Sequence, residues 1–283
     1  MWRERVSKLE SYWHGKTVLI TGASSGLGWA VTEALAPYGV HFALLSRREE
    51  KMRELVEQLR DTPSRFWFRS VDVRDREQVY AAVRDFVAEA GRLDVAWVNS
   101  GIGGSTAFDR WDWEHVEAMI DTNLKGAIYT TMACLEQMVS QGYGTIVGIG
   151  SASSMRGLPG RGIYSVTKIA LHYYLESLMP ELPQIQFTII HPGFVDTPIN
   201  QNNPNRFWLL QPPEAARLMI TAVAKGKRVY IYPLKMRLLY RLVHALPMRT
   251  YLWVGRKMLR ISNPAGEEVK LNRVSADEQT SEP

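Results

Sequence analysis

The chain has 283 residues, of which 46% are hydrophobic and 22% charged, a composition typical of a globular protein with a sizeable core. No apolar run approaches the roughly 20 residues of a membrane-spanning helix, and the N-terminal residues lack the apolar region of a secretory signal. The single cysteine, Cys134, excludes an internal disulfide, and the six histidines lack zinc-binding spacing, so we expect no metal site. These features favour a reducing, cytoplasmic setting.

The net charge is +5, and much of the excess lies in the C-terminal third. A basic end attracts acidic lipid or nucleic acid, or simply forms a solvated surface, and the charge alone leaves these alternatives open. We expect no nucleic-acid partner.

Apolar, β-branched runs alternate with segments of helical periodicity along most of the chain. The elements predicted in chain order are strand 17–21, helix 27–36, strand 40–45, helix 49–60, strand 66–71, helix 75–90, strand 95–99, helix 113–139, strand 145–149, helix 164–182, strand 186–191, helix 214–224 and strand 229–232. This alternation predicts an α/β fold, a Rossmann-like doubly wound parallel sheet of about seven strands with helices on both faces.

The predicted organisation is one nucleotide-binding and catalytic domain over 1–232, in which 1–15 form an N-terminal extension. An amphipathic helical extension follows over 233–264. The polar composition of 265–283 predicts a disordered tail.

A glycine-rich segment, TGASSGLG at 21–28, separates the first predicted strand from the first helix. Gly22, Gly26 and Gly28 allow a tight turn and the close approach of a ligand, and the helix N-terminus that follows offers free N–H groups to a phosphate. A glycine loop alone often makes only a turn. Its position after the first strand of an alternating α/β chain favours dinucleotide binding.

The end of the second strand indicates which dinucleotide binds. NAD sites usually carry Asp or Glu there to bind the ribose 2′-hydroxyl, whereas this chain has Ser46, Arg47 and Arg48. Without a carboxylate, an arginine fork can grip a 2′-phosphate, which gives roughly a 10- to 150-fold preference. We therefore expect NADP(H). Arg48 also fits a simpler alternative, as the surface residue that begins the next helix.

Tyr164 and Lys168 lie four residues apart, on one face of a predicted helix. Reduction of a carbonyl needs a proton donor, and tyrosine with its free pKa of about 10 is a poor one. An ammonium about 4 Å away stabilises a phenolate by roughly 4 kcal/mol, which would bring the pKa near 7. Ser151, at the end of the preceding strand, is placed to hold the substrate oxygen. The simpler alternatives are a chance helix pair and ordinary loop serines at 151, 153 and 154.

The chain resembles the short-chain dehydrogenase/reductase family over about residues 16–232. The motifs that carry the resemblance are TGASSGLG, VDV at 71–73, NSG at 99–101, TNLKG at 122–126, the YxxxK pair with Ser151 thirteen residues before it, and HPGFVDTP at 191–198. The resemblance implies an NADP(H)-preferring oxidoreductase that acts on an alcohol or a carbonyl.

The resemblance also implies a role for individual residues. Tyr164 would be the acid/base, and Ser151 would orient the substrate oxygen. Lys168 would hold the nicotinamide ribose and lower the pKa of Tyr164, and Asn123 would position a water that passes protons to Lys168. The implied catalytic residues are Asn123, Ser151, Tyr164 and Lys168. The implied cofactor-binding residues are Gly22, Ser24, Ser25, Gly26, Leu27, Gly28, Ser46, Arg47, Arg48, Asp72, Val73, Asn99, Ser100, Gly101, Tyr164, Lys168, Pro192, Gly193, Val195 and Thr197.

Two positions depart from the family pattern. The family usually has Asn-Asn-Ala-Gly after the fourth strand, and Val98 stands here in place of the first Asn. Gly148 stands where the family often has Asn. The change at Val98 concerns local strand packing more than activity, and none of the four implied catalytic positions is lost.

Aromatic residues surround the expected substrate cleft. Residues 194–211 correspond to the family's substrate lid and carry Phe207 and Trp208, while Trp111 and Trp113 lie in another loop near the cleft. Such a wall suits a bulky apolar carbonyl compound, such as a steroid, a retinoid, or a long-chain or aromatic ketone. The alternative is that these aromatic residues pack at a subunit interface.

Both ends of the chain carry apolar stripes at helical spacing. Beyond the usual family core, one stripe with basic residues beside it comprises Met236, Leu239, Leu242, Val243 and Leu246. This pattern fits a helix that packs on its own domain, on a partner subunit, or on a membrane surface through residues 234–260. The N-terminal stripe has the same ambiguity and comprises Trp2, Val6, Leu9 and Trp13.

The sequence therefore predicts an NADPH-dependent oxidoreductase that reduces a ketone or aldehyde to an alcohol, or catalyses the reverse reaction, on a bulky apolar substrate. The alternatives are an NADP(H)-binding regulatory protein and a membrane-associated scaffold with little turnover. We expect a homodimer or homotetramer with contacts through the helices at 113–139 and 164–182. The expected location is cytoplasmic, with or without membrane contact.

Overall fold

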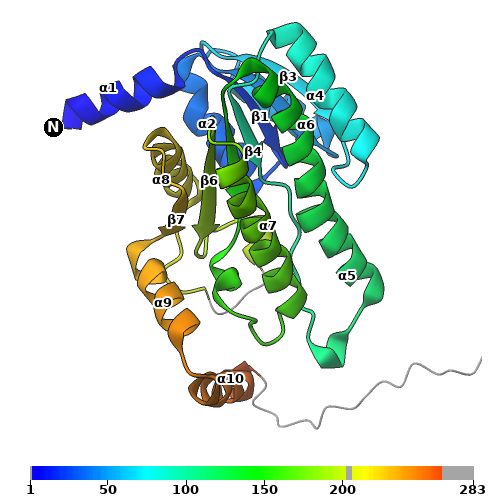
Figure 1. Ribbon diagram of the computed structural model, residues 1–283, viewed down its shortest axis with the longest axis vertical. Helices are drawn as coiled ribbons and strands as arrows, with labels where there is room; N and C mark the ends of the chain where they lie inside the picture. Colours follow the sequence, from blue (N-terminus) through cyan, green and yellow to red (C-terminus); the bar gives the residue numbers. More distant parts are fainter. Residues whose placement is uncertain (1, 202–205, 263–283) are drawn as a thin grey trace, which may run out of the picture.

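Seven parallel strands form one sheet at the centre of the computed structural model (Figure 1). Their spatial order is β3-β2-β1-β4-β5-β6-β7, which confirms the predicted doubly wound fold. The strands are β1 (Thr17–Thr21), β2 (His41–Ser46), β3 (Arg65–Ser70), β4 (Val95–Val98), β5 (Gly144–Ile149), β6 (Ile185–Pro192) and β7 (Val229–Tyr232).

The structure describes residues 2–201 and 206–262, and it describes side chains over 8–201 and 206–257. The tail predicted over 265–283 lies outside the described residues, as do the side chains of Trp2 and Val6 from the N-terminal stripe. No described helix is long and apolar enough to cross a membrane.

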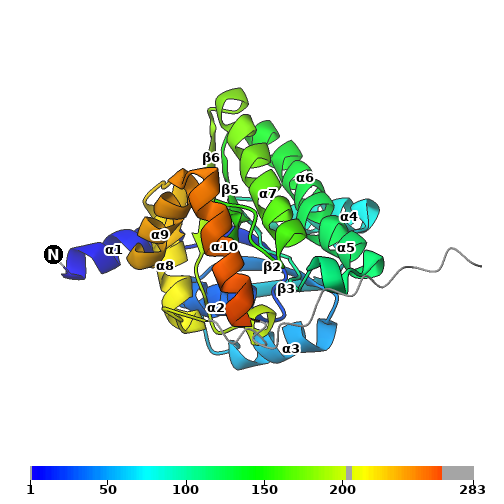
Figure 2. The ribbon, with the colours of Figure 1, turned by 90° about the horizontal axis from the view of Figure 1, so that it is seen from below.

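Helices cover both faces of the sheet because its strands are buried on both sides. One face is covered by α2 (Gly26–Leu35), α3 (Glu49–Gln58) and α8 (Pro212–Ala224), together with the C-terminal end of α1 (Trp2–Trp13). The other face is covered by α4 (Arg76–Ala90), α6 (Gly126–Gln141) and α7 (Gly162–Glu181), with α5 (Trp113–Ile120) next to α7. Figure 2 shows the two layers on opposite sides of the sheet.

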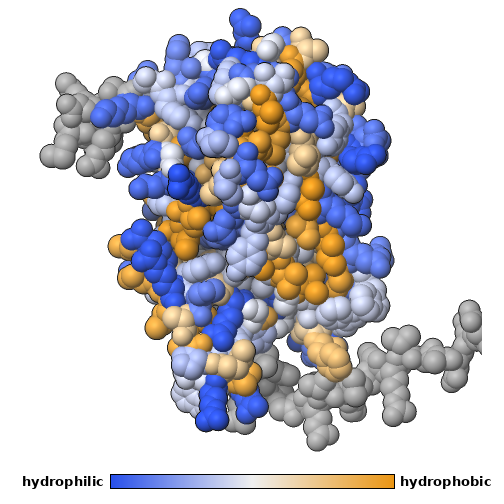
Figure 3. Space-filling model, viewed as in Figure 1, coloured by the Kyte–Doolittle hydropathy of each residue, from blue (hydrophilic) through white to orange (hydrophobic). Residues whose placement is uncertain are grey.

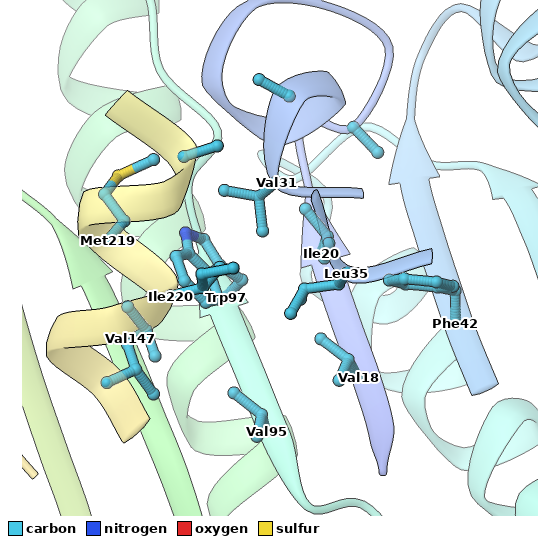
Figure 4. Close-up of a cluster of buried hydrophobic side chains, with 14 of the residues drawn as sticks. Val18, Ile20, Val31, Leu35, Phe42, Val95, Trp97, Val147, Met219 and Ile220 are labelled. Atoms are coloured by element: carbon cyan, nitrogen blue, oxygen red, sulfur yellow. The ribbon is translucent and has the colours of Figure 1, made fainter. Parts of the chain in front are cut away.

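The core of the first face forms where strands and helices far apart in sequence meet (Figure 4). Alternate residues of β1, Val18 and Ile20, point to this side, while Leu19 belongs to the core of the opposite face. Trp13 from α1 is fully buried here, and its indole N–H donates to the carbonyl of Ile220 at 3.3 Å. The last turn of the N-terminal helix is therefore part of the domain core.

The long helix predicted over 113–139 is present as a continuous helical segment over 113–141, but it is not regular. A π-helical turn at Asp121–Lys125 lies between its two α-helical parts, α5 and α6. The side chain of Asn123 in this turn is fully buried and bonded to the backbone of Ile102. A π-turn holds one more residue than a regular helical turn, and this extra residue brings the side chain of Asn123 to the backbone of Ile102.

The C-terminal extension forms two helices, α9 (Leu234–Ala245) and α10 (Met248–Ser262), separated by Leu246 and Pro247. One face of α9 packs on its own domain, where Met236, Leu239 and Val243 meet the loop after β5. In Figure 2, α10 lies across the front of the view from below, over the end of the molecule at which the strands terminate. The extension therefore covers the edge of the sheet where the motifs lie.

Candidate active site

A cavity of about 1050 Å³ lies at the carboxyl ends of the strands. Ligands of doubly wound folds bind at this edge. The cavity brings together every implied site residue except Gly28 and Asn123, which lie directly behind its wall. It runs from the glycine loop and Arg47 at one end to Tyr164, Lys168 and the inner face of α9 at the other.

The glycine loop has the geometry that a phosphate cradle requires. Gly22 and Gly26 adopt φ of +68° and +58°, a left-handed conformation that favours glycine. A Cβ on Gly28 would lie 2.4 Å from the carbonyl oxygen of Gly22, so only glycine fits where α2 meets β1. This cradle at the N-terminus of a buried helix fits the pyrophosphate of a dinucleotide.

The two arginines after β2 have different surroundings. The guanidinium of Arg48 lies over the glycine loop and donates to the hydroxyls of Ser24 (2.9 Å) and Ser25 (2.6 Å). Ser46 also donates to Ser24, at 2.6 Å. Arg47 is exposed, lines the cavity and has no side-chain hydrogen bond or ion pair with the described residues. Arg48 thus bonds to the loop, so it is more than the first surface residue of the next helix.

The neighbouring strand ends complete the cofactor end of the cavity. Asn99 donates its side-chain amide to the carbonyl of Thr21 at 2.9 Å and so joins the ends of β4 and β1. Asp72 is the single carboxylate among the residues that line the cavity. The Arg74 guanidinium beside it lowers its pKa. Three more of the implied cofactor-binding residues line this end of the cavity, namely Val73, Ser100 and Gly101.

Tyr164 is buried at the centre of the cavity wall, beside Ser151. Burial raises the pKa of its phenol, and the neighbouring Ser151 hydroxyl and the Arg161 charge only partly oppose this effect. The expected shift toward 7 by Lys168 is therefore wrong for this structure. Burial dominates the shift, and the Lys168 ammonium, which donates to the carbonyl of Ile149 at 2.9 Å, is not among the groups that lower this pKa.

The side chains of Lys168 and Asn123 both lie next to Gly101. A Cβ on Gly101 would lie 3.2 Å from both the ammonium of Lys168 and the side-chain oxygen of Asn123. Burial lowers the pKa of Lys168 to about 8, so it carries its proton at neutral pH. The amide of Asn123 is held by Ile102 and by the Thr167 hydroxyl. The four implied catalytic residues thus come from the π-turn, the end of β5 and one face of α7.

His191, for which the sequence predicted no role, supports the loop that carries Ser151. The backbone N–H of Ser151 donates to His191 Nδ1 at 3.2 Å, and His191 Nε2 lies 2.8 Å from Nδ1 of His172. Burial lowers the pKa of His191 to about 4. A signal was present, because His172 follows Tyr164 and Lys168 at the same four-residue spacing on α7.

The segment after β6 closes the cavity opposite the glycine loop. The N–H of Gly193 donates to the Tyr232 carbonyl at 2.8 Å, which holds this segment against β7. The Thr197 side chain faces Gly26, because a Cβ added to Gly26 would lie 3.4 Å from Cβ and Cγ2 of Thr197. Pro192 and Val195 line the same wall.

The substrate end of the cavity has an aliphatic wall. Phe207 lies on the cavity, but Trp111, Trp113 and Trp208 do not, so most of the expected aromatic wall is wrong. Trp111 and Trp113 instead pack edge to face, with ring centroids 5.3 Å apart, on the surface where α5 begins. The wall comprises Met155, Leu158, Met236, Leu239, Val243, Leu246 and Val254.

Arg156 holds this wall in place. Its guanidinium donates to the carbonyl of Val243 at 3.2 Å and to that of Leu246 at the end of α9. The same group lies 4.3 Å from the ring centroid of Tyr251 on α10. A cation at a helix C-terminus satisfies free carbonyls there. The loop after β5 therefore fixes the position of both C-terminal helices.

The position of Gly148 explains one departure from the family pattern. A Cβ at this residue would lie 2.2 Å from Cδ1 of Leu175 on α7. Leu175 is fully buried and fills the space that an asparagine side chain would need. The departure is therefore compensated within the core, away from the cavity.

Comparisons with known proteins agree with the motifs and the fold. Residues 16–206 match the sequence profile of the family described as short chain dehydrogenase. An uncharacterized oxidoreductase of Myxococcus xanthus is 34% identical over 247 residues, which cover 86% of this chain and 97% of the relative. An uncharacterized oxidoreductase of Staphylococcus saprophyticus is 33% identical over 229 residues, with coverage of 78% and 97%.

Solved structures show the same architecture. An alcohol dehydrogenase from Thermococcus sibiricus, complexed with 5-hydroxy-NADP, has a TM-score of 0.70 at 28% identity and covers 77% of this chain and 95% of its own. A dehydrogenase/reductase from Burkholderia phymatum in complex with NAD has a TM-score of 0.75 at 22% identity, with coverage of 82% and 94%, which shows the fold alone. With the profile match over most of the chain, these findings establish that the protein belongs to the short-chain dehydrogenase family and is an oxidoreductase.

Proposed function

We propose that this oxidoreductase uses NADPH to reduce the carbonyl of a bulky, largely aliphatic substrate to an alcohol. The observation that carries the proposal is the continuity of one cavity. It joins a phosphate cradle and an arginine pair at one end to Tyr164, Ser151 and Lys168, and then to an aliphatic wall at the other. A dinucleotide and an apolar carbonyl compound would meet at the centre of this cavity.

The preference for NADPH rests on the end of β2. Ser46 stands where a carboxylate would repel a 2′-phosphate, and Arg47 offers a guanidinium with no described partner. In this proposal Arg47 binds the 2′-phosphate, and Arg48 holds the hydroxyls of Ser24 and Ser25 in place. The similar dehydrogenase from Thermococcus sibiricus holds an NADP analogue and that from Burkholderia phymatum holds NAD, so the choice of NADPH rests on these residues.

The residues around the substrate carbonyl divide the chemistry among them. When bound, NADPH supplies a hydride to the carbonyl carbon. Ser151 holds the carbonyl oxygen beside the phenol of Tyr164, which donates its proton to that oxygen. Lys168, whose ammonium is held by the Ile149 carbonyl, would bind the nicotinamide ribose. Asn123 holds the backbone of Ile102 in place beside this site.

The phenol of Tyr164 holds its proton at neutral pH, because burial raises its pKa above the usual value for tyrosine. Which direction the reaction takes then follows the ratio of NADPH to NADP. The reverse reaction needs the phenolate as a base, which would form only at higher pH.

We also propose a homodimer or homotetramer in the cytoplasm. Exposed apolar side chains lie on α6 and α7, including Met132, Val139 and Val166. In Figure 3 an apolar strip runs along the face over these helices. Light scattering of the purified protein would test this assembly, and Val166→Glu should shift it toward the monomer. An unchanged mass for that variant would contradict this choice of interface.

The experiment for the proposed function is a fluorescence titration with NADPH and with NADH, followed by turnover on a series of ketones of increasing aliphatic size. We expect tighter binding of NADPH and a KM that falls as the aliphatic part grows. Tighter binding of NADH would overturn the role of Arg47. Tight binding without turnover of any carbonyl would favour the regulatory alternative.

A further inference from the structure

The C-terminal helices have a second apolar surface, on the side away from the cavity. Leu234, Leu238 and Leu242 follow one another at four-residue intervals on α9 and are each 58% to 62% exposed. Successive residues of an α-helix turn by about 100°, which places this stripe opposite the buried Met236 and the partly buried Val243. The same helix therefore has one apolar face against the domain and another in solvent.

The neighbouring helix α10 continues this surface. Met248, Leu252 and Trp253 are exposed, Trp253 by 64%. Figure 1 shows α9 and α10 at the lower end of the molecule, joined at a sharp bend. We call the six exposed residues, Leu234, Leu238, Leu242, Met248, Leu252 and Trp253, the outer apolar face.

Basic residues surround the outer apolar face, and residues 234–262 contain no Asp or Glu. In Figure 3 hydrophilic and apolar side chains lie next to one another over α9. No described carboxylate forms an ion pair with these cations. The exposed cations are Lys235, Arg237, Arg241, Arg249, Arg256 and Lys257.

We propose that the outer apolar face docks on the surface of an anionic phospholipid bilayer. An amphipathic helix with leucine and tryptophan on one face and Lys or Arg beside them lies in the plane of a membrane interface. The charges attract anionic head groups, while the apolar side chains enter the boundary with the acyl chains.

Two other occupants fit the surface less well. A second copy of the chain in a two-fold interface would bring the same cations against one another, with no acidic residue of this segment to offset them. A nucleic acid would pair with the cations but would leave the six apolar side chains in water. Charge complementarity and apolar exposure together favour an anionic membrane.

The position of this face has a consequence for the substrate, which rests on the proposed function. The inner faces of α9 and α10 line the aliphatic end of the cavity, and their outer faces form the docking surface. A docked enzyme would therefore receive an apolar carbonyl compound directly from the lipid phase.

The test is sedimentation of the full chain with phosphatidylcholine vesicles that contain or lack phosphatidylglycerol. We expect binding to the anionic vesicles alone, and a loss of affinity of about tenfold or more for Leu238→Glu combined with Leu242→Glu. The matched control is Tyr143→Glu, which adds a charge at an exposed residue before β5, at the opposite edge of the sheet. Lys235→Gln combined with Arg241→Gln should weaken binding most at low ionic strength.

Several outcomes would overturn the proposal. One is that the leucine variants bind anionic vesicles as tightly as Tyr143→Glu does. Another is that the unmodified chain binds neither type of vesicle, or binds duplex DNA but no vesicles. A change of oligomeric state in the leucine variants with unchanged vesicle binding would also overturn it. Turnover of a water-soluble ketone, measured without vesicles, should be unchanged in these variants, so a failure of docking is distinguishable from a failure of the proposed function.

Discussion

The two ends of the cavity are built in different ways. The cofactor end consists of short loops that directly follow β1, β2 and β4, and each loop carries a compact motif. The substrate end is closed by contacts between distant segments, such as the bond from Arg156 to Leu246, 90 residues later. Recognition of the cofactor is therefore encoded locally, whereas the shape offered to the substrate depends on the docking of α9 and α10.

The largest expected effect lies where the two ends meet. Tyr164→Phe removes the proton donor but keeps the ring, so kcat for carbonyl reduction should fall by about 10²- to 10⁴-fold. The affinity for NADPH, measured by fluorescence, should stay the same. Tyr173→Phe changes an exposed tyrosine of the same helix and serves as the control. Retained activity in Tyr164→Phe would contradict the assigned role.

Protonation of His191, which accepts a hydrogen bond from the Ser151 backbone, should destabilise the fold at acidic pH. The folded pKa of His191, about 4, is below its unfolded value of about 6.5, so the unfolded state binds the proton first. The free energy of unfolding should therefore fall between pH 6.5 and 4, by up to roughly 3 kcal/mol from this group. Urea denaturation across this range measures the slope. His191→Asn should flatten it, whereas His14→Asn, at an exposed residue, should leave it unchanged.

The cofactor end should respond differently to the loss of each arginine. Arg47→Ala should lower the preference for NADPH over NADH by roughly 10- to 150-fold, because it removes the charged partner of the 2′-phosphate. Arg48→Ala should weaken both cofactors alike, since its guanidinium orders Ser24 and Ser25. Titration of both variants with both cofactors provides the measurement. An unchanged ratio in Arg47→Ala would reject this division of roles.

The substrate end should be sensitive to Arg156. Arg156→Ala leaves the last carbonyls of α9 without their charged donor, so the aliphatic wall should loosen and KM for a large ketone should rise by roughly tenfold. The Kd for NADPH should be unchanged, because the cofactor end has no contact with this residue. Arg84→Ala, an exposed position on α4, is the control. A parallel loss of NADPH affinity would show that the two ends are coupled.

The sequence predicts what depends on neighbouring residues. The seven strands fall within a residue or two of their predicted positions, because each is a short apolar run bounded by a turn. The π-turn was missed because it depends on bonds from Asn123 to Ile102 and Thr167, distant in the chain. The wall formed by α9 and the raised pKa of Tyr164 were missed for the same reason, since both depend on tertiary burial.

The π-turn at Asp121–Lys125 also constrains how the length of this chain can change. A π-turn holds an extra residue compared with a regular helix. Deletion of one residue there would restore a regular helix and leave α6 facing the core, because five π-helical residues turn the chain about as far as four α-helical ones. The stripe that includes Thr130, Cys134 and Met138 would stay buried, whereas Asn123 would lose its place beside Ile102. A one-residue deletion in this segment should therefore still fold but lose activity, whereas substitution of the exposed Lys125 should be tolerated.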